Sequence, residues 1–150
     1  MIYGGRDGNG RWIGDLVWAL TLDGTPQWLP LSASPTGRHL SAGAYDPVGD
    51  RFIVFGGYDG DSSRSDLWAL TMSNQRWERL APAGQVPDAR SGHSAIYDPV
   101  RNRVVVFAGN QGMTRFADTW ELSLSGSALY LREAPMWVPL PTSDDRSFIY

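Results

Sequence analysis

The chain repeats itself with a period close to 52 residues, and this period limits the folds that it can adopt. A short apolar segment that ends in glycine occurs three times, at residues 2–5, 53–57 and 105–109. Other recurring residues keep nearly the same spacing; Tyr45 and Tyr97, for example, are also 52 residues apart. Self-similarity at one period across a whole chain indicates stacked copies of one supersecondary unit rather than one irregular domain.

Each unit is predicted to consist of four short strands. In the best-preserved unit the strand-like segments are residues 41–45, 52–55, 66–70 and 76–80. Residues 52–55 are apolar at every position, which is typical of a strand covered on both faces. No stretch combines helical periodicity with a cap. Four antiparallel strands per fifty-odd residues make up one blade of a β-propeller, whose apolar faces are buried only against neighbouring blades.

Several recurring residues mark the repeat. The predicted structural positions are Gly4, Gly5, Gly56, Gly57, Gly109, Trp18, Trp68, Trp120, Trp28, Trp77, Tyr45 and Tyr97. The double glycine after an apolar strand, the following Asp-x-Trp and the second Trp resemble the kelch motif, and the period favours kelch over the shorter WD40 repeat. Residues 90–99 resemble bacterial kelch proteins that are described as similar to the propeller of galactose oxidase. Ala108 departs from the pattern in place of a first glycine.

The repeats divide the chain into parts of a kelch-type propeller. We expect a partial blade of three strands at residues 1–31, whole blades at 38–80 and 90–133, and a linker with the start of another blade at 134–150. In this scheme Tyr130 takes the place of the second Trp in the third unit. The resemblance implies a ring of six or seven blades. About three blades are present, so we expect part of a longer propeller; the alternative is two such arcs that close one ring.

Composition excludes several classes of function. The formal net charge is −3 with charges of both signs interspersed, which gives no basic patch for nucleic acid or an anionic membrane. Cysteine is absent, so no disulfide framework or thiolate metal site is expected. No apolar run approaches the length of a membrane span. No metal or cofactor is expected, and the compartment is left open between the cytoplasm and export.

The resemblance places the candidate ligand-binding loops on one face of the propeller. These loops are residues 6–14, 58–65 and 110–117, joined by the segments 35–38, 82–90 and 139–146. Arg38, Arg90 and Arg146 stand at the entrances of successive inner strands, where guanidinium groups would clasp carboxylates. The favoured alternative is structural, with each Arg bound to backbone or to an Asp such as Asp66. Further ligand candidates in these loops are Trp12, Arg11, Tyr58 and Phe116.

Two other signals carry less weight. His93 has the chemistry to titrate or to bind a metal, but we expect a hydrogen-bonded structural residue because the other histidine, His39, is not at the equivalent position. The loop at residues 59–66 has an acidic start that suggests calcium. It lacks the glycine and the glutamate of an EF-hand, since Leu70 stands at the twelfth position, so that site is rejected.

The favoured function is a non-catalytic binding or scaffold module that presents loops to a protein or glycan partner. We assign no catalytic residue. The alternative is part of a sugar-modifying enzyme that acts on an acidic carbohydrate, similar to the kelch-like propellers that mutarotate sialic acid. On that view Arg38, Arg90 and Arg146 would hold the substrate carboxylate. A galactose oxidase activity is rejected because that enzyme needs a Tyr cross-linked to Cys, and the chain has no Cys.

Overall fold

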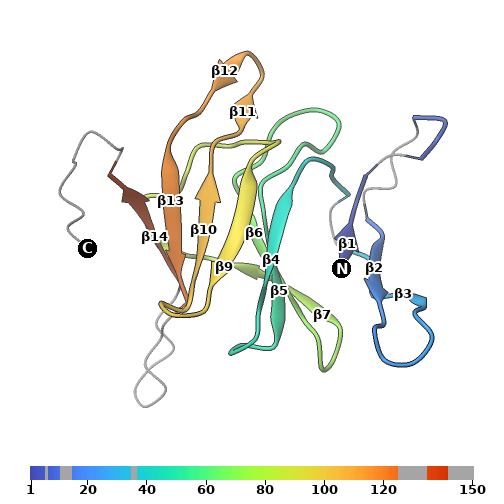
Figure 1. The fold of residues 1–150 in the computed structure, drawn as a ribbon. Coiled ribbons are helices and arrows are strands. Elements are labelled where there is room, and N and C mark those ends of the chain that lie inside the picture. Colours follow the sequence, from blue (N-terminus) through green and yellow to red (C-terminus); the bar gives the residue numbers. More distant parts are fainter. Residues whose placement is uncertain (6, 11–14, 35–36, 125–134, 142–150) are drawn as a thin grey trace.

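The computed structural model describes residues 1–5, 7–10, 15–34, 37–124 and 135–141. Within these ranges every regular element is a β-strand, and the strands form three larger sheets that lie side by side and one small two-stranded sheet (Figure 1). Each larger sheet corresponds to one repeat of the sequence. The prediction of an all-β fold made of small antiparallel sheets is therefore confirmed.

The strands follow one another in space much as they do along the chain. The first sheet contains β1 (Ile2–Tyr3), β2 (Val17–Leu20) and β3 (Trp28–Pro30). The second contains β4 (Ala42–Asp46), β5 (Arg51–Phe55), β6 (Leu67–Thr71) and β7 (Arg76–Leu80). The third contains β9 (Ser94–Asp98), β10 (Arg103–Phe107), β13 (Thr119–Ser123) and β14 (Met136–Leu140), with β8 (Ala83–Gly84) parallel to β14 at its edge. A hairpin of β11 (Asn110–Gln111) and β12 (Thr114–Arg115) lies between β10 and β13.

The three sheets share one strand register. The first recurring tryptophans pair with apolar residues of the preceding strand, as Trp18 with Ile2, Trp68 with Val54 and Trp120 with Val106. The second recurring tryptophans also lie opposite equivalent leucines, as Trp28 opposite Leu20 and Trp77 opposite Leu70. Because side chains alternate between the faces of a sheet, a shared register places equivalent residues on equivalent faces.

The outer strand of the third sheet lies outside the predicted blade 90–133. It is β14, at residues 136–140, where the sequence analysis places a linker, and that prediction is wrong for this strand. Trp137 pairs with Leu122 as Trp77 pairs with Leu70, so Trp137 takes the place assigned to Tyr130. The connection from β13 to β14 is much longer than the four-residue turn from β6 to β7, which breaks the constant offset. Tyr130 itself lies outside the described residues.

The recurring Tyr-Asp-Pro segment closes the turn of the inner hairpin. The Asp46 carboxylate accepts hydrogen bonds from the backbone N–H groups of Val48 and Gly49, at 3.0 Å each, and from Arg51 Nε at 2.9 Å. The Tyr45 hydroxyl donates to Asp50 at 2.8 Å. The third sheet repeats this arrangement with Tyr97, Asp98, Asn102 and Arg103. Side-chain capping of this kind fixes a turn and thereby the register of the two strands.

The core lies between the second and third sheets. Ile53, Phe55 and Leu67 face Val106, Leu122 and Trp137 there, and all six are almost fully buried. The rings of Phe55 and Trp137 approach to 4.9 Å between centroids. Phe107 is the equivalent of Phe55 on the far side of the third sheet, yet it is 52% exposed against 2% for Phe55. One face of each sheet is therefore buried only where another sheet covers it.

The glycine pair after the second strand allows two sheets to approach. Gly56 and Gly57 have φ angles of 59° and 95°, a left-handed conformation that side chains disfavour. A Cβ on Gly56 would lie 2.6 Å from the carbonyl oxygen of Arg90 in the next repeat. The Gly57 N–H donates to that same oxygen at 2.8 Å. Ala108 also has a positive φ of 61°, so the third sheet keeps this backbone shape without the glycine.

Candidate binding face

The loops that follow the glycine pairs gather at one end of the sheets, where Figure 1 shows β11 and β12. Backbone bridges join the second and third of these loops to the segment that enters the inner strand of the same sheet. His39 and Tyr58 exchange hydrogen bonds of 3.0 and 2.8 Å, and Ser91 and Asn110 exchange two of 2.9 Å. The described parts of the predicted loop face are thus held by backbone pairing rather than by side chains alone.

Arg38 and Arg90 lie beneath this face in equivalent ion pairs. Arg38 is 2% exposed, and its guanidinium donates to both carboxylate oxygens of Asp66, at 2.5 and 2.9 Å, and to the carbonyl oxygen of Gly56 at 2.9 Å. Arg90 is fully buried and binds Asp118 at 2.6 and 2.9 Å and the carbonyl oxygen of Ala108 at 3.0 Å. A bidentate pair of this kind fixes the orientation of both side chains.

The carboxylates of these pairs also bind the recurring tryptophans. The indole N–H groups of Trp68 and Trp120 donate to Asp66 and Asp118, each at 2.7 Å. Burial alone would raise the pKa of Asp66, but hydrogen bonds from Arg38 and Trp68 outweigh it and hold the pKa below the usual range. The hydrogen bond from Arg90 likewise lowers the pKa of Asp118, against partial burial. Both carboxylates therefore stay ionised and keep their arginines in place.

This geometry fits the alternative in which each arginine has a structural role and binds backbone and an aspartate. The guanidinium groups of Arg38 and Arg90 point at internal oxygens, and both recurring Asp-x-Trp motifs belong to the same network. Ligand binding by these arginines stays a prediction that the geometry does not favour. Arg146, Arg11 and Trp12, the other candidates at the entrances and in the first loop, lie outside the described residues.

Tyr58 and Phe116 occupy different environments in the two loops. The Tyr58 ring packs edge-on against His39, with centroids 5.3 Å apart, so it holds the loop to the entering segment. The Phe116 ring lies 4.3 Å from the Arg90 guanidinium carbon and covers that ion pair. Phe116 also lines a pocket beside the hairpin, so this predicted ligand candidate lies at a cavity.

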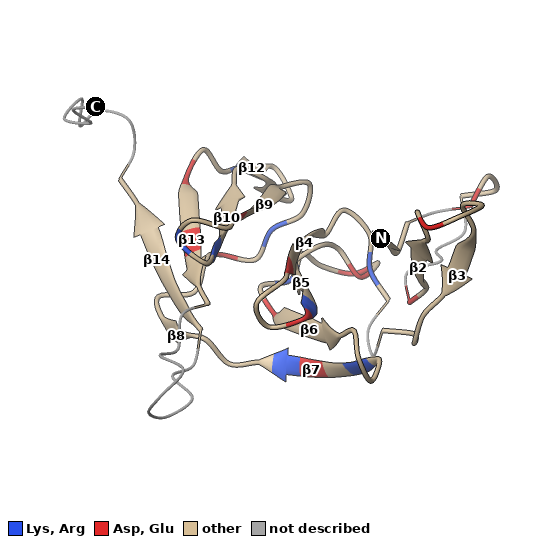
Figure 2. Ribbon diagram, turned by 60° about the horizontal axis from the view of Figure 1, so that its bottom comes forward, with Lys and Arg blue, Asp and Glu red and all other residues tan. Residues whose placement is uncertain are grey.

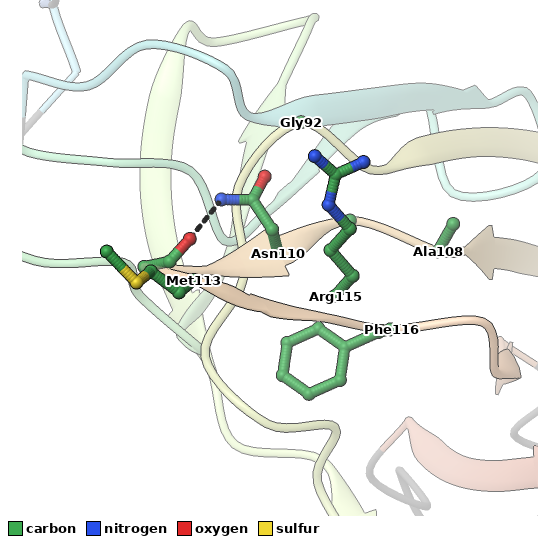
Figure 3. Close-up of a pocket in the computed structure, with 8 residues that line it drawn as sticks. Gly92, Ala108, Asn110, Met113, Arg115 and Phe116 are labelled. Atoms are coloured by element: carbon green, nitrogen blue, oxygen red, sulfur yellow. Dashed lines mark hydrogen bonds between the residues drawn. The ribbon is translucent and has the colours of Figure 1, made fainter.

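The pocket beside the hairpin contains residues that the sequence analysis did not single out. It has a volume of about 730 Å³, and Asn110, Met113 and Arg115 line it together with glycines and Phe116. Asn110 and Arg115 are cross-strand neighbours, and both extend toward Gly92 in Figure 3. Met113 is fully exposed at the tip, and Arg115 makes no ion pair among the described residues. The available signal was that residues 110–117 match the other loops poorly.

His93 lies behind the pocket, between the second and third sheets. Its ring packs edge-on against Phe55, with centroids 5.4 Å apart, and neither ring nitrogen has a hydrogen-bond partner among the described residues. Burial, followed by the charge of Arg90, lowers the pKa of His93 to about 4, with a small opposing influence from the Phe55 backbone. His93 is therefore a neutral packing residue at pH 7, without the hydrogen bond that we expected.

A model of the KLHDC2/KLHL20/DRC7 Kelch-repeats domain matches residues 1–128. The match covers all three sheets apart from the outer strand of the third. The chain belongs to the kelch-repeat family. Its four-stranded sheets are kelch blades, and in the described residues they form an arc that does not close into a ring. Kelch domains generally mediate protein–protein interaction, which makes a protein-interaction module the coarse description of this chain.

Several curated proteins are similar to the chain. A leucine-zipper-like transcriptional regulator 1 homolog of Drosophila melanogaster is 33% identical over 53% of this chain. Dynein regulatory complex subunit 7 of Chlamydomonas reinhardtii is 33% identical over 63%, and Kelch repeat-containing protein 2 of Saccharomyces cerevisiae is 30% identical over 61%. The chain spans 9%, 8% and 11% of these relatives. All three are eukaryotic, so they do not support the resemblance to bacterial kelch proteins.

Among the described residues, no three His, Asp or Glu side chains come together in a way that would hold a metal ion. No helix in that part of the chain is long and apolar enough to cross a membrane.

Proposed function

We propose that this chain is a non-catalytic protein-interaction module, and that the hairpin β11–β12 with its pocket is the main contact for the protein partner. The observation that carries the proposal is the fully exposed Met113 at the tip of a hairpin that a backbone bridge and Phe116 hold in place. A preformed loop loses little entropy on binding, so its exposed side chains contribute most of their contact energy to affinity.

The hairpin suits a protein partner. Methionine adapts to irregular apolar surfaces and is frequent at binding surfaces. Arg115 adds a cation without an ion pair among the described residues, and arginine is enriched in interfaces. The pocket volume also lies in the range of about 300–1,000 Å³ that accommodates a side chain or short segment of a ligand.

No observation on the described residues favours the sugar-modifying alternative. That alternative needs Arg38 and Arg90 to hold a substrate carboxylate, whereas both guanidinium groups already bind Asp66 and Asp118. These internal ion pairs favour the interaction module over the enzyme.

Selection of binding peptides from a displayed library against the folded chain tests the proposal. Peptides that bind the hairpin should lose affinity for Met113→Glu and Arg115→Glu. Val100→Glu is the matched control, because Val100 is similarly exposed in the turn from β9 to β10, at the opposite end of the third sheet. Equal affinities of all selected peptides for the parent chain and the two hairpin variants would reject this site.

A further inference from the structure

The second sheet differs from the other two at one position of its outer strand. The residue opposite the first recurring tryptophan is Pro30 in the first sheet and Pro139 in the third. In the second sheet this residue is Arg79, which pairs with Trp68. Directly opposed residues of antiparallel strands have Cβ atoms about 4.5–5.5 Å apart, so the arginine stem starts beside the indole ring.

A pocket opens at this position. It has a volume of about 830 Å³, and Trp68, Arg79, Leu80, Pro82 and Val86 line it together with the loop at residues 59–66. It shares no lining residue with the pocket beside the hairpin. Proline in place of Arg79 would remove the charged side chain that β7 contributes to this pocket, whereas Leu80 of the same strand would remain. A cation at this place is thus specific to the second of the three larger sheets.

Arg79 is the cation of this pocket that has no internal partner. It is exposed and forms no ion pair or side-chain hydrogen bond among the described residues. The other two arginines of the pocket are already engaged, since Arg38 binds Asp66 and Arg64 binds Asp59. In Figure 2, β7 is the edge strand of this sheet and carries both basic (blue) and acidic (red) segments.

The tryptophan beside Arg79 is partly accessible. Trp120, at the equivalent place of the third sheet, is 7% exposed, whereas Trp68 is only half-buried. The indole N–H of Trp68 donates to Asp66 at 2.7 Å, so the apolar ring rather than the N–H is what a ligand meets. A cation beside an open aromatic ring and apolar walls matches an anion that has an apolar neighbour.

We propose that this pocket is a second binding site, for an acidic peptide segment. A carboxylate of the segment binds Arg79 bidentately, and an adjacent apolar side chain packs on Trp68, Leu80 and Val86. The pocket has one cation without an internal ion pair and several apolar lining residues. A peptide, which carries a carboxylate next to an apolar side chain, therefore fits it better than an inorganic anion does. This site is separate from the hairpin and does not depend on the function proposed for it.

The test uses the indole N–H signals of the chain in two-dimensional NMR spectra, with the Trp68 signal identified through Trp68→Phe. The probe is acetyl-Asp-Leu-Asp-Leu-amide, and its control is the Asn-Leu-Asn-Leu analogue. We expect the acidic peptide to shift the Trp68 signal saturably. Arg79→Pro, which restores the residue of the other two sheets, should weaken binding by about tenfold or more, because a charge-assisted hydrogen-bond pair is lost.

Three further samples make the outcome decisive. Arg79→Ala replaces Arg79→Pro if the proline prevents folding. Arg76→Ala on the same strand and Arg101→Ala in the third sheet, where Arg101 forms an exposed ion pair with Asp98, should leave the affinity unchanged. The proposal is overturned if the Trp68 signal does not move, if the Asn analogue binds equally well, or if both Arg79 variants retain full affinity. An equal shift with inorganic phosphate would also overturn it, since it would show a general anion patch.

Discussion

The second and third sheets contain the same hydrogen-bonded network but differ in the residues that border it. Both contain an arginine that binds an aspartate 28 residues later, and that aspartate binds the tryptophan of the next strand. Around this shared network, Arg64 in the second sheet is replaced by Phe116 in the third, and Arg79 by Pro139. The comparison shows that hydrogen-bonded residues carry the fold, while the residues that border them create the pockets.

Equivalent aspartates and tryptophans of the two sheets are also buried to different degrees. The carboxylate partner of Arg38 is 16% exposed, whereas that of Arg90 is 34% exposed. Trp68 is half-buried and Trp120 nearly fully buried. Equivalent residues of the two sheets therefore contribute differently to stability, and substitutions made in pairs measure that difference.

The largest effect is expected for the ion pairs. Arg38→Ala should lower the free energy of unfolding by about 3–5 kcal/mol, because it leaves Asp66 charged and poorly solvated. Arg90→Ala should cost less, since water reaches Asp118 more easily. Chemical denaturation of both variants measures the two losses. Arg101→Ala removes an exposed pair and serves as control, with an expected change of about 0–1 kcal/mol. A loss at Arg38 no greater than this control would show that the network does not stabilise the fold.

The tryptophans come next. Trp120→Ala should cost about 3–5 kcal/mol through the loss of buried area and the cavity that remains. Trp68→Ala should cost less, because part of the Trp68 ring is already in water. Thermal and urea unfolding of the two variants gives the comparison. Equal losses would mean that the two rings are equally buried in solution.

A pH effect of about 3 kcal/mol is expected from His93. Its pKa in the folded chain is about 4, below the ordinary 6.5, so the unfolded chain binds the proton more readily. This contribution is therefore fully present above pH 6.5 and is lost as the pH falls to about 4. His93→Ser introduces the residue of the second sheet, Ser41, and should remove the pH dependence in this window. The pKa values of Asp66 and Asp118 are also lowered, so these carboxylates affect stability at a lower pH than His93 does. An unchanged pH profile in His93→Ser would contradict the assignment.

The smallest effects have opposite signs at equivalent positions. Gly56→Ala should destabilise the chain by about 2 kcal/mol or more, since the left-handed backbone disfavours a side chain and the new Cβ would contact the Arg90 carbonyl. Ala108→Gly should stabilise it by about 0.5–1 kcal/mol, as relief of strain exceeds the entropy cost of glycine. Melting curves of the two variants measure both changes in stability. A stabilising Gly56→Ala would refute the close approach of the two sheets.

Much of the scaffold was predictable because the repeat fixes which residues are equivalent. Asp66 and Asp118 recur with the same offset as Arg38 and Arg90, so the ion pairs were already visible as the structural alternative. The strand β14 was missed because a long insertion before Met136 breaks the offset that located the other strands.

The site was harder to predict than the scaffold. The exposure of Met113 and the absence of a partner for Arg115 depend on how the hairpin projects, which the sequence of a non-repetitive loop does not determine. Arg79 stands out only when the register reveals prolines at the equivalent positions. Such departures become informative once the pairing of the strands is known.

The most direct test of the separation between scaffold and binding face is one titration of a selected hairpin-binding peptide, performed with Arg38→Ala and Met113→Glu at a temperature where both are folded. We expect Arg38→Ala to melt at a lower temperature and to bind the peptide with unchanged affinity. We expect Met113→Glu to melt like the parent chain and no longer to bind. Lost affinity in Arg38→Ala together with full affinity in Met113→Glu would contradict this separation.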